Sequence, residues 1–126
     1  DPQLTKNFHI KEWRCHDGTD VPWSLVENVT KCATNLQALR NALGKPVTII
    51  SGFRSGAYND SIGSKRTSQH IKGFAADIRV AGVSPTEVAS LIEGLIKDGD
   101  MDQGGVGVYN SFTHYDCRGT KARWKG

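Results

Sequence analysis

The sequence predicts a single small α+β domain with a mainly antiparallel sheet and two principal helices. Its 126 residues are enough for one hydrophobic core and too few for two ordinary domains. Two segments carry apolar residues at helical spacing, and at least four short apolar or β-branched runs are typical of strands. These segments do not alternate strictly between strand and helix, which favours an α+β arrangement. We therefore expect one domain over residues 1–126.

The two predicted helices have clear boundaries. Residues 24–43 place apolar side chains three and four positions apart, and Gly44 follows as a C-cap. A second helix, over residues 84–98, begins with a serine N-cap, a proline in the first turn and Glu87, which completes a capping box. Both helices are amphipathic, so each is expected to cover the sheet with one face.

Four strands are predicted from short runs bounded by turn residues. Their ranges are 46–50, 73–80, 105–109 and 112–117. The last two are joined tightly around Asn110 and Ser111. Because side chains alternate along a strand, His114 and Asp116 are expected on one face of the last strand. The polar segment 53–69 has no sustained helical or strand period, and a loop of that length in a small protein is typical of a functional site.

Composition argues against two classes of partner. The formal net charge is +3, and no recognised nucleic-acid-binding motif accompanies the basic C-terminal residues, so we expect a solvated tail and no nucleic-acid partner. The apolar runs are too short to cross a bilayer and no export signal is visible, so no membrane partner is expected. The basic tail residues are Arg118, Lys121, Arg123 and Lys125. The chain is expected to be a monomer.

Cysteines and tryptophans are interpreted mainly as packing residues. The cysteines are Cys15, Cys32 and Cys117. Their odd number and wide spacing allow at most one disulfide and leave the redox compartment open. Cys32 lies within the first helical pattern and is expected in the core. The tryptophans are Trp13, Trp23 and Trp124, and all three are expected to pack in the core or at an edge.

A metal site is the sharpest functional hypothesis from the residues themselves. A catalytic zinc ion takes three nitrogen, sulfur or carboxylate ligands and keeps one position open. His70, Asp77 and His114 would supply such a set, with Gly73 allowing the backbone to bend between the first two. Spacing alone favours the simpler alternative, in which His70 is a hydrogen-bonding loop residue and Asp77 faces solvent.

Four ordered motifs strengthen the metal hypothesis. Residues 68–77, SQHIKGFAAD, fit the pattern S-x-H-x-x-G-x-A-x-D at all five specified positions. The other motifs are SGFRS at 51–55, FTHYDCRG at 112–119 and NFHIKEWRCHDG at 7–18. Together they resemble the zinc D-Ala-D-Ala carboxypeptidase/endopeptidase family, peptidase family M15, and the last resembles its short, phage-associated branch.

The resemblance implies a fold, a cofactor and a substrate. The fold is the small domain shared by these peptidases and the Hedgehog signalling domain, with one Zn²⁺ per chain held by His70, Asp77 and His114. The substrate class is the stem peptides of bacterial peptidoglycan, which contain D-amino acids, so the site of action would be the cell wall. Arg54 would bind a substrate carboxylate or carbonyl, for which its planar guanidinium is suited. Ser68 and Tyr109 are further candidates for substrate binding.

One position departs from the family pattern. Many members place an acidic general base three residues before the last metal histidine, where this chain has Ser111. Either Asp116 takes the proton from metal-bound water, or the base comes from elsewhere, or Asp116 only orients His114. The preferred function is metal-assisted amide hydrolysis, with Asp116 and Arg54 as catalytic residues. The alternative is a non-catalytic wall-binding or protein-binding module that keeps zinc for stability.

Overall fold

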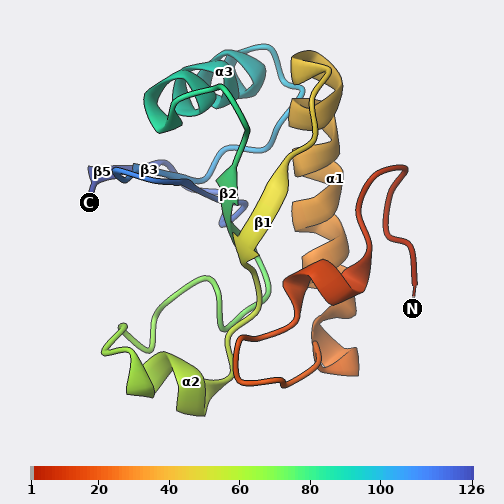
Figure 1. Ribbon diagram of the computed structural model, residues 1–126, viewed down its shortest axis with the longest axis vertical. Coiled ribbons are helices and arrows are strands. Elements are labelled where there is room, and N and C mark those ends of the chain that lie inside the picture. Colours follow the sequence, from red (N-terminus) through yellow and green to blue (C-terminus); the bar gives the residue numbers. More distant parts are fainter. Residues whose placement is uncertain (1) are drawn as a thin grey trace.

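The computed structural model describes residues 2–126 and contains one five-stranded sheet of order β1-β2-β4-β3-β5 (Figure 1). The strands are β1 Thr48–Ser51, β2 Ala75–Arg79, β3 Gly105–Val108, β4 Thr113–Asp116 and β5 Ala122–Lys125. The α-helices are α1 Val26–Leu43, α2 Gly56–Ser61 and α3 Pro85–Lys97. Two 3₁₀ turns, Ile10–Trp13 and Trp23–Leu25, precede α1. All strand pairs are antiparallel except β3 and β5, so the predicted α+β class is confirmed.

The two principal helices form for the predicted local reasons. At the start of α3 the Ser84 hydroxyl accepts a hydrogen bond from the Glu87 N–H at 3.2 Å, and the Glu87 carboxylate accepts one from the Ser84 N–H at 3.3 Å. This reciprocal box satisfies two backbone donors that the helix leaves free. At the C-terminal end of α1, Gly44 adopts a φ of +64°, the left-handed conformation that glycine takes readily.

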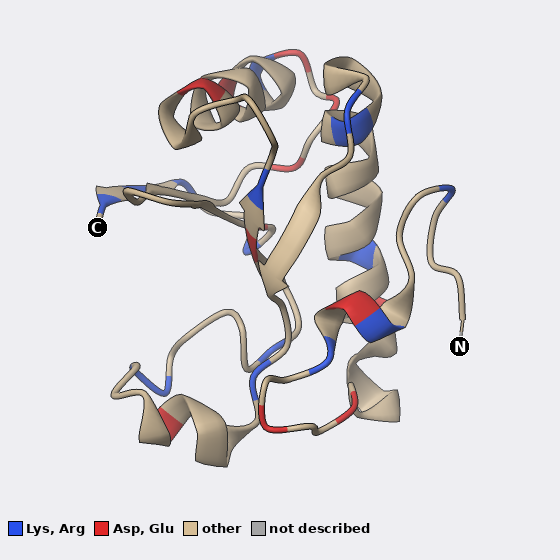
Figure 2. Ribbon diagram, viewed as in Figure 1, with Lys and Arg blue, Asp and Glu red and all other residues tan. Residues whose placement is uncertain are grey.

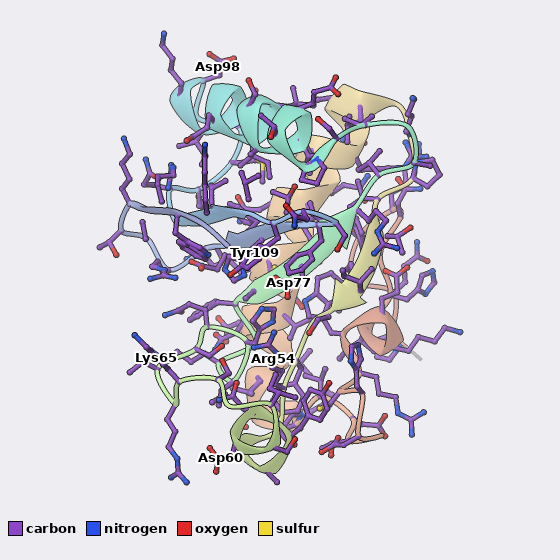
Figure 3. All side chains as sticks on the ribbon, turned by 60° about the vertical axis from the view of Figure 1, so that its left-hand side comes forward. Arg54, Asp60, Lys65, Asp77, Asp98 and Tyr109 are labelled. Atoms are coloured by element: carbon purple, nitrogen blue, oxygen red, sulfur yellow. The ribbon has the colours of Figure 1, made fainter. Side chains whose placement is uncertain are left out.

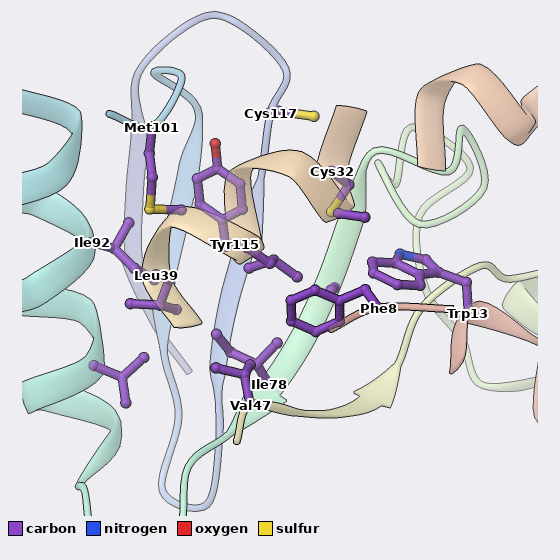
Figure 4. Close-up of a cluster of buried hydrophobic side chains, with 14 of the residues drawn as sticks. Phe8, Trp13, Cys32, Leu39, Val47, Ile78, Ile92, Met101, Tyr115 and Cys117 are labelled. Atoms are coloured by element: carbon purple, nitrogen blue, oxygen red, sulfur yellow. The ribbon is translucent and has the colours of Figure 1, made fainter. Parts of the chain in front are cut away.

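The core lies on the face of the sheet that α1 and α3 cover (Figure 4). Leu39 of α1 and Ile92 of α3 join a buried cluster with Ile78 of β2 and Tyr115 of β4. Because side chains alternate along a strand, the neighbours of Ile78 and Tyr115 point to the opposite face. The predicted face assignment in β4 and the core position of Cys32 are both confirmed.

The opposite face carries a row of facing residues across four strands. Asp77 of β2 is the direct partner of His114 of β4, which in turn lies opposite Gly107 of β3. Gly107 is paired with Trp124 of the parallel strand β5. A Cβ at position 107 would collide with the Trp124 indole. Glycine there lets the indole lie over the sheet and reach His114, with ring centroids 4.9 Å apart.

Several predictions were wrong in detail. The segment 53–69 contains the short helix α2, and the end of the basic tail forms strand β5, although Arg118, Lys121 and Lys125 are exposed as predicted. Arg123 of that strand bonds Glu93 of α3 at 2.7 Å. Trp23 is 86% exposed and therefore does not pack in the core or at an edge. The cysteines agree with the expectation of at most one disulfide, because all three are buried free thiols.

Charged residues of both signs are distributed over helices, loops and strands rather than gathered on one element (Figure 2). Within residues 2–126, no helix combines the length and apolar character needed to cross a bilayer.

Candidate metal centre

Three donor side chains converge on the uncovered face of the sheet. Asp77 Oδ1 lies 3.3 Å from His70 Nε2 and 3.0 Å from His114 Nδ1. The three ligand atoms lie within 4.8 Å of one another, and all three residues are buried. Two imidazole nitrogens and one carboxylate oxygen form a donor set suited to Zn²⁺. The residues present therefore fit the implied metal.

Each histidine is fixed by a second partner on its other ring nitrogen. His70 Nδ1 lies 2.7 Å from the Gly52 carbonyl oxygen, and His114 Nε2 lies 2.7 Å from Asp116 Oδ2. Both partners are acceptors, so these nitrogens suit the proton-bearing position when a metal is held. The nitrogens that face Asp77 would then be the ligand atoms and would give up the protons that they share with its carboxylate, an arrangement typical of metal-binding histidines.

Burial and hydrogen bonding set the protonation of the three groups. Burial lowers the pKa of His70 below its ordinary value. Burial also lowers the pKa of His114, but hydrogen bonds to Asp116 and Asp77 outweigh it and raise that pKa. Burial opposes ionisation of Asp77, yet hydrogen bonds from His114 and His70 hold its pKa well below the usual range. Asp77 is therefore ionised and available as an anionic ligand.

Asp116 is buried behind His114. Its side chain is 0% exposed, and its carboxylate also accepts hydrogen bonds from Arg118 Nε and Nη2, both at 2.8 Å. The Gly105 N–H donates to the same carboxylate at 3.0 Å. A Cβ at position 105 would collide with this carboxylate, so glycine is required for the close approach. Asp116 is not one of the described residues that line the cleft over His114.

The donors lie in the floor of an open cleft of about 660 Å³. Arg54, Lys65 and Arg118 line it, and Asp77 is the one acidic residue among its described lining residues. Arg54 Nη2 lies 3.4 Å from Asp77 Oδ2 and Nη1 lies 3.4 Å from Ser64 Oγ, while its buried Nε has no partner. In Figure 3, Asp77 lies between Arg54 below it and Tyr109 above it. The cleft therefore favours an anionic ligand.

Aromatic side chains form one wall. Tyr109 stacks on Phe112 with ring centroids 4.3 Å apart, and the Trp124 indole N–H donates to the Tyr109 hydroxyl at 2.8 Å. Arg118 lies over the Trp124 ring at 5.6 Å. The Tyr109 hydroxyl therefore accepts one hydrogen bond within this wall, and its own proton is available to another acceptor.

The remaining predicted positions differ in location. Ser68 lines the cleft, and its hydroxyl accepts a hydrogen bond from the His70 N–H at 3.2 Å, which stabilises the turn carrying that histidine. Ser111 is exposed in the β3–β4 turn, where its carbonyl accepts from Arg79 at 3.1 Å. It lines a separate hollow with Arg79 rather than the cleft. The Ser111 side chain therefore does not line the cleft that contains the donors.

Three residues at or beside the site were not identified from the sequence. Arg118 follows Asp116 by two positions and so continues the alternation that groups His114 and Asp116, a signal that was available. Trp124 was treated only as packing. Asp17 has no sequence signal of its own, and only tertiary contacts reveal its proximity to the segment carrying Arg54.

The fold and the donor set define a small α+β domain with a candidate metal centre on a mainly antiparallel sheet. Residues 2–116 match the family model of peptidase M15. The chain therefore belongs to the peptidase M15 family, which confirms the relationship predicted from the motifs.

Two curated relatives agree with this family. The chain is 38% identical over 110 residues to a probable peptidoglycan L,D-endopeptidase of Haemophilus influenzae, an alignment covering 82% of this chain and 53% of the relative. It is 48% identical over 44 residues to the zinc D-Ala-D-Ala carboxypeptidase of Streptomyces albus G, covering 34% of this chain and 17% of the relative. The aligned part is thus about half the length of the first relative and less than a fifth of the second.

Proposed function

We propose that this chain is a zinc-dependent peptidoglycan peptidase, a single domain that hydrolyses amide bonds in wall stem peptides containing D-amino acids. The observation that carries the proposal is the buried set of His70, Asp77 and His114 in the floor of an open cleft. Family membership and the names of both relatives point to the same chemistry. The action would be on the bacterial cell wall.

The metal would be held by His70 Nε2, Asp77 Oδ1 and His114 Nδ1. Zinc bound there would supply a Lewis acid and a bound water with a pKa lowered to ~7. The protein would contribute the orientation of the two imidazoles, because Gly52 and Asp116 hold them by their other nitrogens.

Substrate binding is assigned to the cationic and polar lining. The Arg54 guanidinium would bind a stem-peptide carboxylate or carbonyl, since its Nε is unpartnered and its other two contacts are long. The Tyr109 hydroxyl accepts from Trp124 and can donate its own proton to a peptide carbonyl. Ser68 would act mainly by holding the His70 turn.

For Asp116 we favour orientation of His114 over proton transfer. Its carboxylate is fully buried and accepts hydrogen bonds from His114, Arg118 and Gly105. A general base must come within hydrogen-bonding reach of the proton that it takes, directly or through one water. Asp116 is separated from the cleft by the His114 ring, so the orienting role accounts better for its contacts.

A second function has one observation in its favour. The described lining of the cleft has no carboxylate other than Asp77 and no histidine other than the two donors. A wall-binding module that keeps zinc for stability would need no further acid or base. Cleavage, rather than binding, therefore distinguishes the two functions.

The test uses purified chain loaded with zinc and defined peptidoglycan fragments. Mass spectrometry of the products should show stem-peptide cleavage that a chelator abolishes while circular dichroism reports a retained fold. His70→Ala should lose both metal and cleavage. Binding to sacculi without any released fragment, at full zinc content, would favour the non-catalytic module. Full cleavage by His70→Ala would refute the site.

A further inference from the structure

Residues 15–19 form a closed turn that lies outside the cleft. The Gly18 N–H donates to the Cys15 carbonyl at 2.9 Å, and the Cys15 N–H donates to the Thr19 carbonyl at 3.0 Å. Gly18 has a φ of +91°, which suits glycine. None of these residues lines the cleft. The turn nevertheless contacts the chain on both sides of Arg54.

The contact closest to Arg54 is made by Asp17. The hydroxyl of Ser55, the next residue in the chain, donates to Asp17 Oδ2 at 2.7 Å. Asp17 Oδ1 accepts from the Thr19 N–H at 2.9 Å, so both carboxylate oxygens are used. The Ser55 N–H also reaches Cys15 Sγ at 3.5 Å. Ser55 is therefore held from its backbone and its side chain by one turn.

Two further contacts extend this hold. His16 Nε2 lies 2.6 Å from the Ile50 carbonyl in β1, and its Nδ1 lies 3.1 Å from the Tyr58 hydroxyl in α2. The Ser55 hydroxyl accepts from the Tyr58 N–H at 3.1 Å as the N-cap of α2. The same hydroxyl thus joins the turn to the helix that follows Arg54.

Arg54 itself has weak side-chain restraints. Its backbone N–H donates to the His70 carbonyl at 3.1 Å, but both guanidinium contacts are 3.4 Å long. Hydrogen bonds of that length are at the outer limit of the useful range. The direction of the guanidinium therefore depends on how firmly the backbone of residues 53–55 is placed.

We infer that Asp17 is a positioning residue, which holds Ser55 so that the neighbouring Arg54 presents its guanidinium to a substrate carboxylate in the cleft. This inference rests on the proposed function of Arg54. It assigns to the turn of residues 15–19 a role in substrate affinity although it touches no substrate. Small displacements of a positioning group are enough to alter catalysis strongly.

The test compares variants of the zinc-loaded full chain on two synthetic stem pentapeptides, one with a free C-terminal carboxylate and one amidated. Asp17→Ala should raise KM for the free peptide about three- to tenfold, the range of one ordinary hydrogen bond, because Asp17 is exposed and water weakens the contribution of its charge. It should leave kcat within about twofold and zinc content unchanged, and the amidated peptide should show no such rise. Asp20→Ala is the matched control, because Asp20 is 85% exposed and pairs with Arg14 instead.

A double-mutant cycle separates positioning from general destabilisation. In an Arg54→Ala background, Asp17→Ala should have no further effect on KM. Ser55→Ala should behave like Asp17→Ala, and Ser55→Thr, which keeps the hydroxyl, should restore the wild-type value. An unchanged KM in both single variants, or an equal rise in the Arg54→Ala background, would overturn the inference.

Hydrogen exchange provides a readout that does not need turnover. Asp17→Ala should speed exchange in the peptide covering residues 52–58, and Asp20→Ala should not. If the wild-type chain neither binds nor cleaves stem peptides, the proposed function fails. Hydrogen exchange alone then tests whether Asp17 holds the backbone around Arg54. Unchanged exchange in Asp17→Ala would then refute the positioning role.

Discussion

The substitution Asp116→Asn tests the arrangement behind His114. It keeps the shape of the side chain but removes its charge and one of its two acceptor oxygens. Five N–H donors converge on the carboxylate, from His114 at 2.7 Å, from Arg118 at 2.8, 2.8 and 3.2 Å, and from Gly105 at 3.0 Å. The new amide NH₂ would face some of these donors, so hydrogen bonds would be lost and donors would oppose one another.

The expected cost is about 3 kcal/mol in the free energy of unfolding. Breaking a buried ion pair costs roughly 3–5 kcal/mol, and the 29% exposure of Arg118 reduces this because water can solvate the freed guanidinium. For a chain of this size the melting temperature should fall by about 10 °C. Zinc affinity should fall about 10- to 100-fold, since His114 loses the acceptor that sets its tautomer.

Urea unfolding by circular dichroism and zinc competition with a chelating dye at pH 7 measure both effects. The matched control is Asp60→Asn, which removes another carboxylate–arginine pair, with Arg66, at exposed positions. That change should cost less than about 1 kcal/mol and leave zinc affinity unchanged. If Asp116→Asn keeps wild-type stability and zinc affinity but loses turnover, Asp116 is a base and the orienting role is wrong.

Three further predictions concern the supports of the site. Gly52→Ala should lower the free energy of unfolding by about 2 kcal/mol, measured by urea titration, because a Cβ there would lie 2.7 Å from the Trp13 backbone. Arg123→Ala should lower the free energy of unfolding by about 1 kcal/mol and speed hydrogen exchange in β5. The guanidinium that it removes forms hydrogen bonds with Glu93 of α3 and with Gln103 in the loop before β3. Hydrogen bonds from Ser55 and then Thr19 hold the pKa of Asp17 well below its ordinary value, so Ser55→Ala should raise that pKa toward ~3.9 in a carboxyl NMR titration.

The sign of the last effect follows from linkage. A pKa depressed by folding contributes stability above the ordinary pKa, and that contribution is lost as pH falls through the folded value. The stability difference between wild type and Ser55→Ala should therefore narrow below about pH 4. A difference that widens in acid would contradict this account.

Gly56→Ala and Lys125→Ala serve as controls for Gly52→Ala and Arg123→Ala, respectively. Gly56→Ala should be tolerated, because no heavy atom lies within 4 Å of a Cβ at that position. Lys125→Ala should leave exchange in β5 unchanged, since Lys125 is exposed. Equal losses in Gly52→Ala and Gly56→Ala, or in Arg123→Ala and Lys125→Ala, would show that the named contacts are not responsible.

The elements predicted correctly are those with strong local signals. The capping box at Ser84 and the αL glycine at residue 44 are encoded within a few residues, and the two-residue hairpin turn at 110–111 is equally local. Such signals depend on backbone chemistry that tertiary contacts do not override here. They defined both principal helices and the β3–β4 hairpin.

The missed elements depend on distant partners. Helix α2 buries only Asn59, so it has no apolar stripe for periodicity to reveal. Strand β5 carries Arg123 and Lys125, which read as a solvated tail until the contact with Glu93 is seen. In both cases tertiary context decides a structure that local propensity leaves open.

The residues of the site also divide into those that local sequence signals predict and those whose roles depend on distant contacts. The sequence motifs predict His70, Asp77 and His114 as a ligand set, and the fold brings their donor atoms within reach of one ion. The separate roles of Asp116 and Asp17 depend on which partners they contact, in one case behind an imidazole and in the other across a turn. Spacing predicts that Asp116 lies beside His114, but it does not show that Asp116 is buried behind the ring or that Asp17 contacts Ser55.

The direct pairing of Asp77 with His114 has a consequence for how the protein assembles. The β3–β4 hairpin is local and can form early, whereas β2 and β4 are separated in the chain by α3 and must close a long loop before they pair. The complete ligand set exists only after that step. A metal ion held by these three residues would therefore bind late in folding, and because it would bind the assembled sheet, it would stabilise the native state in proportion to the logarithm of its concentration. Added zinc should therefore lower the rate of unfolding more than it raises the rate of folding.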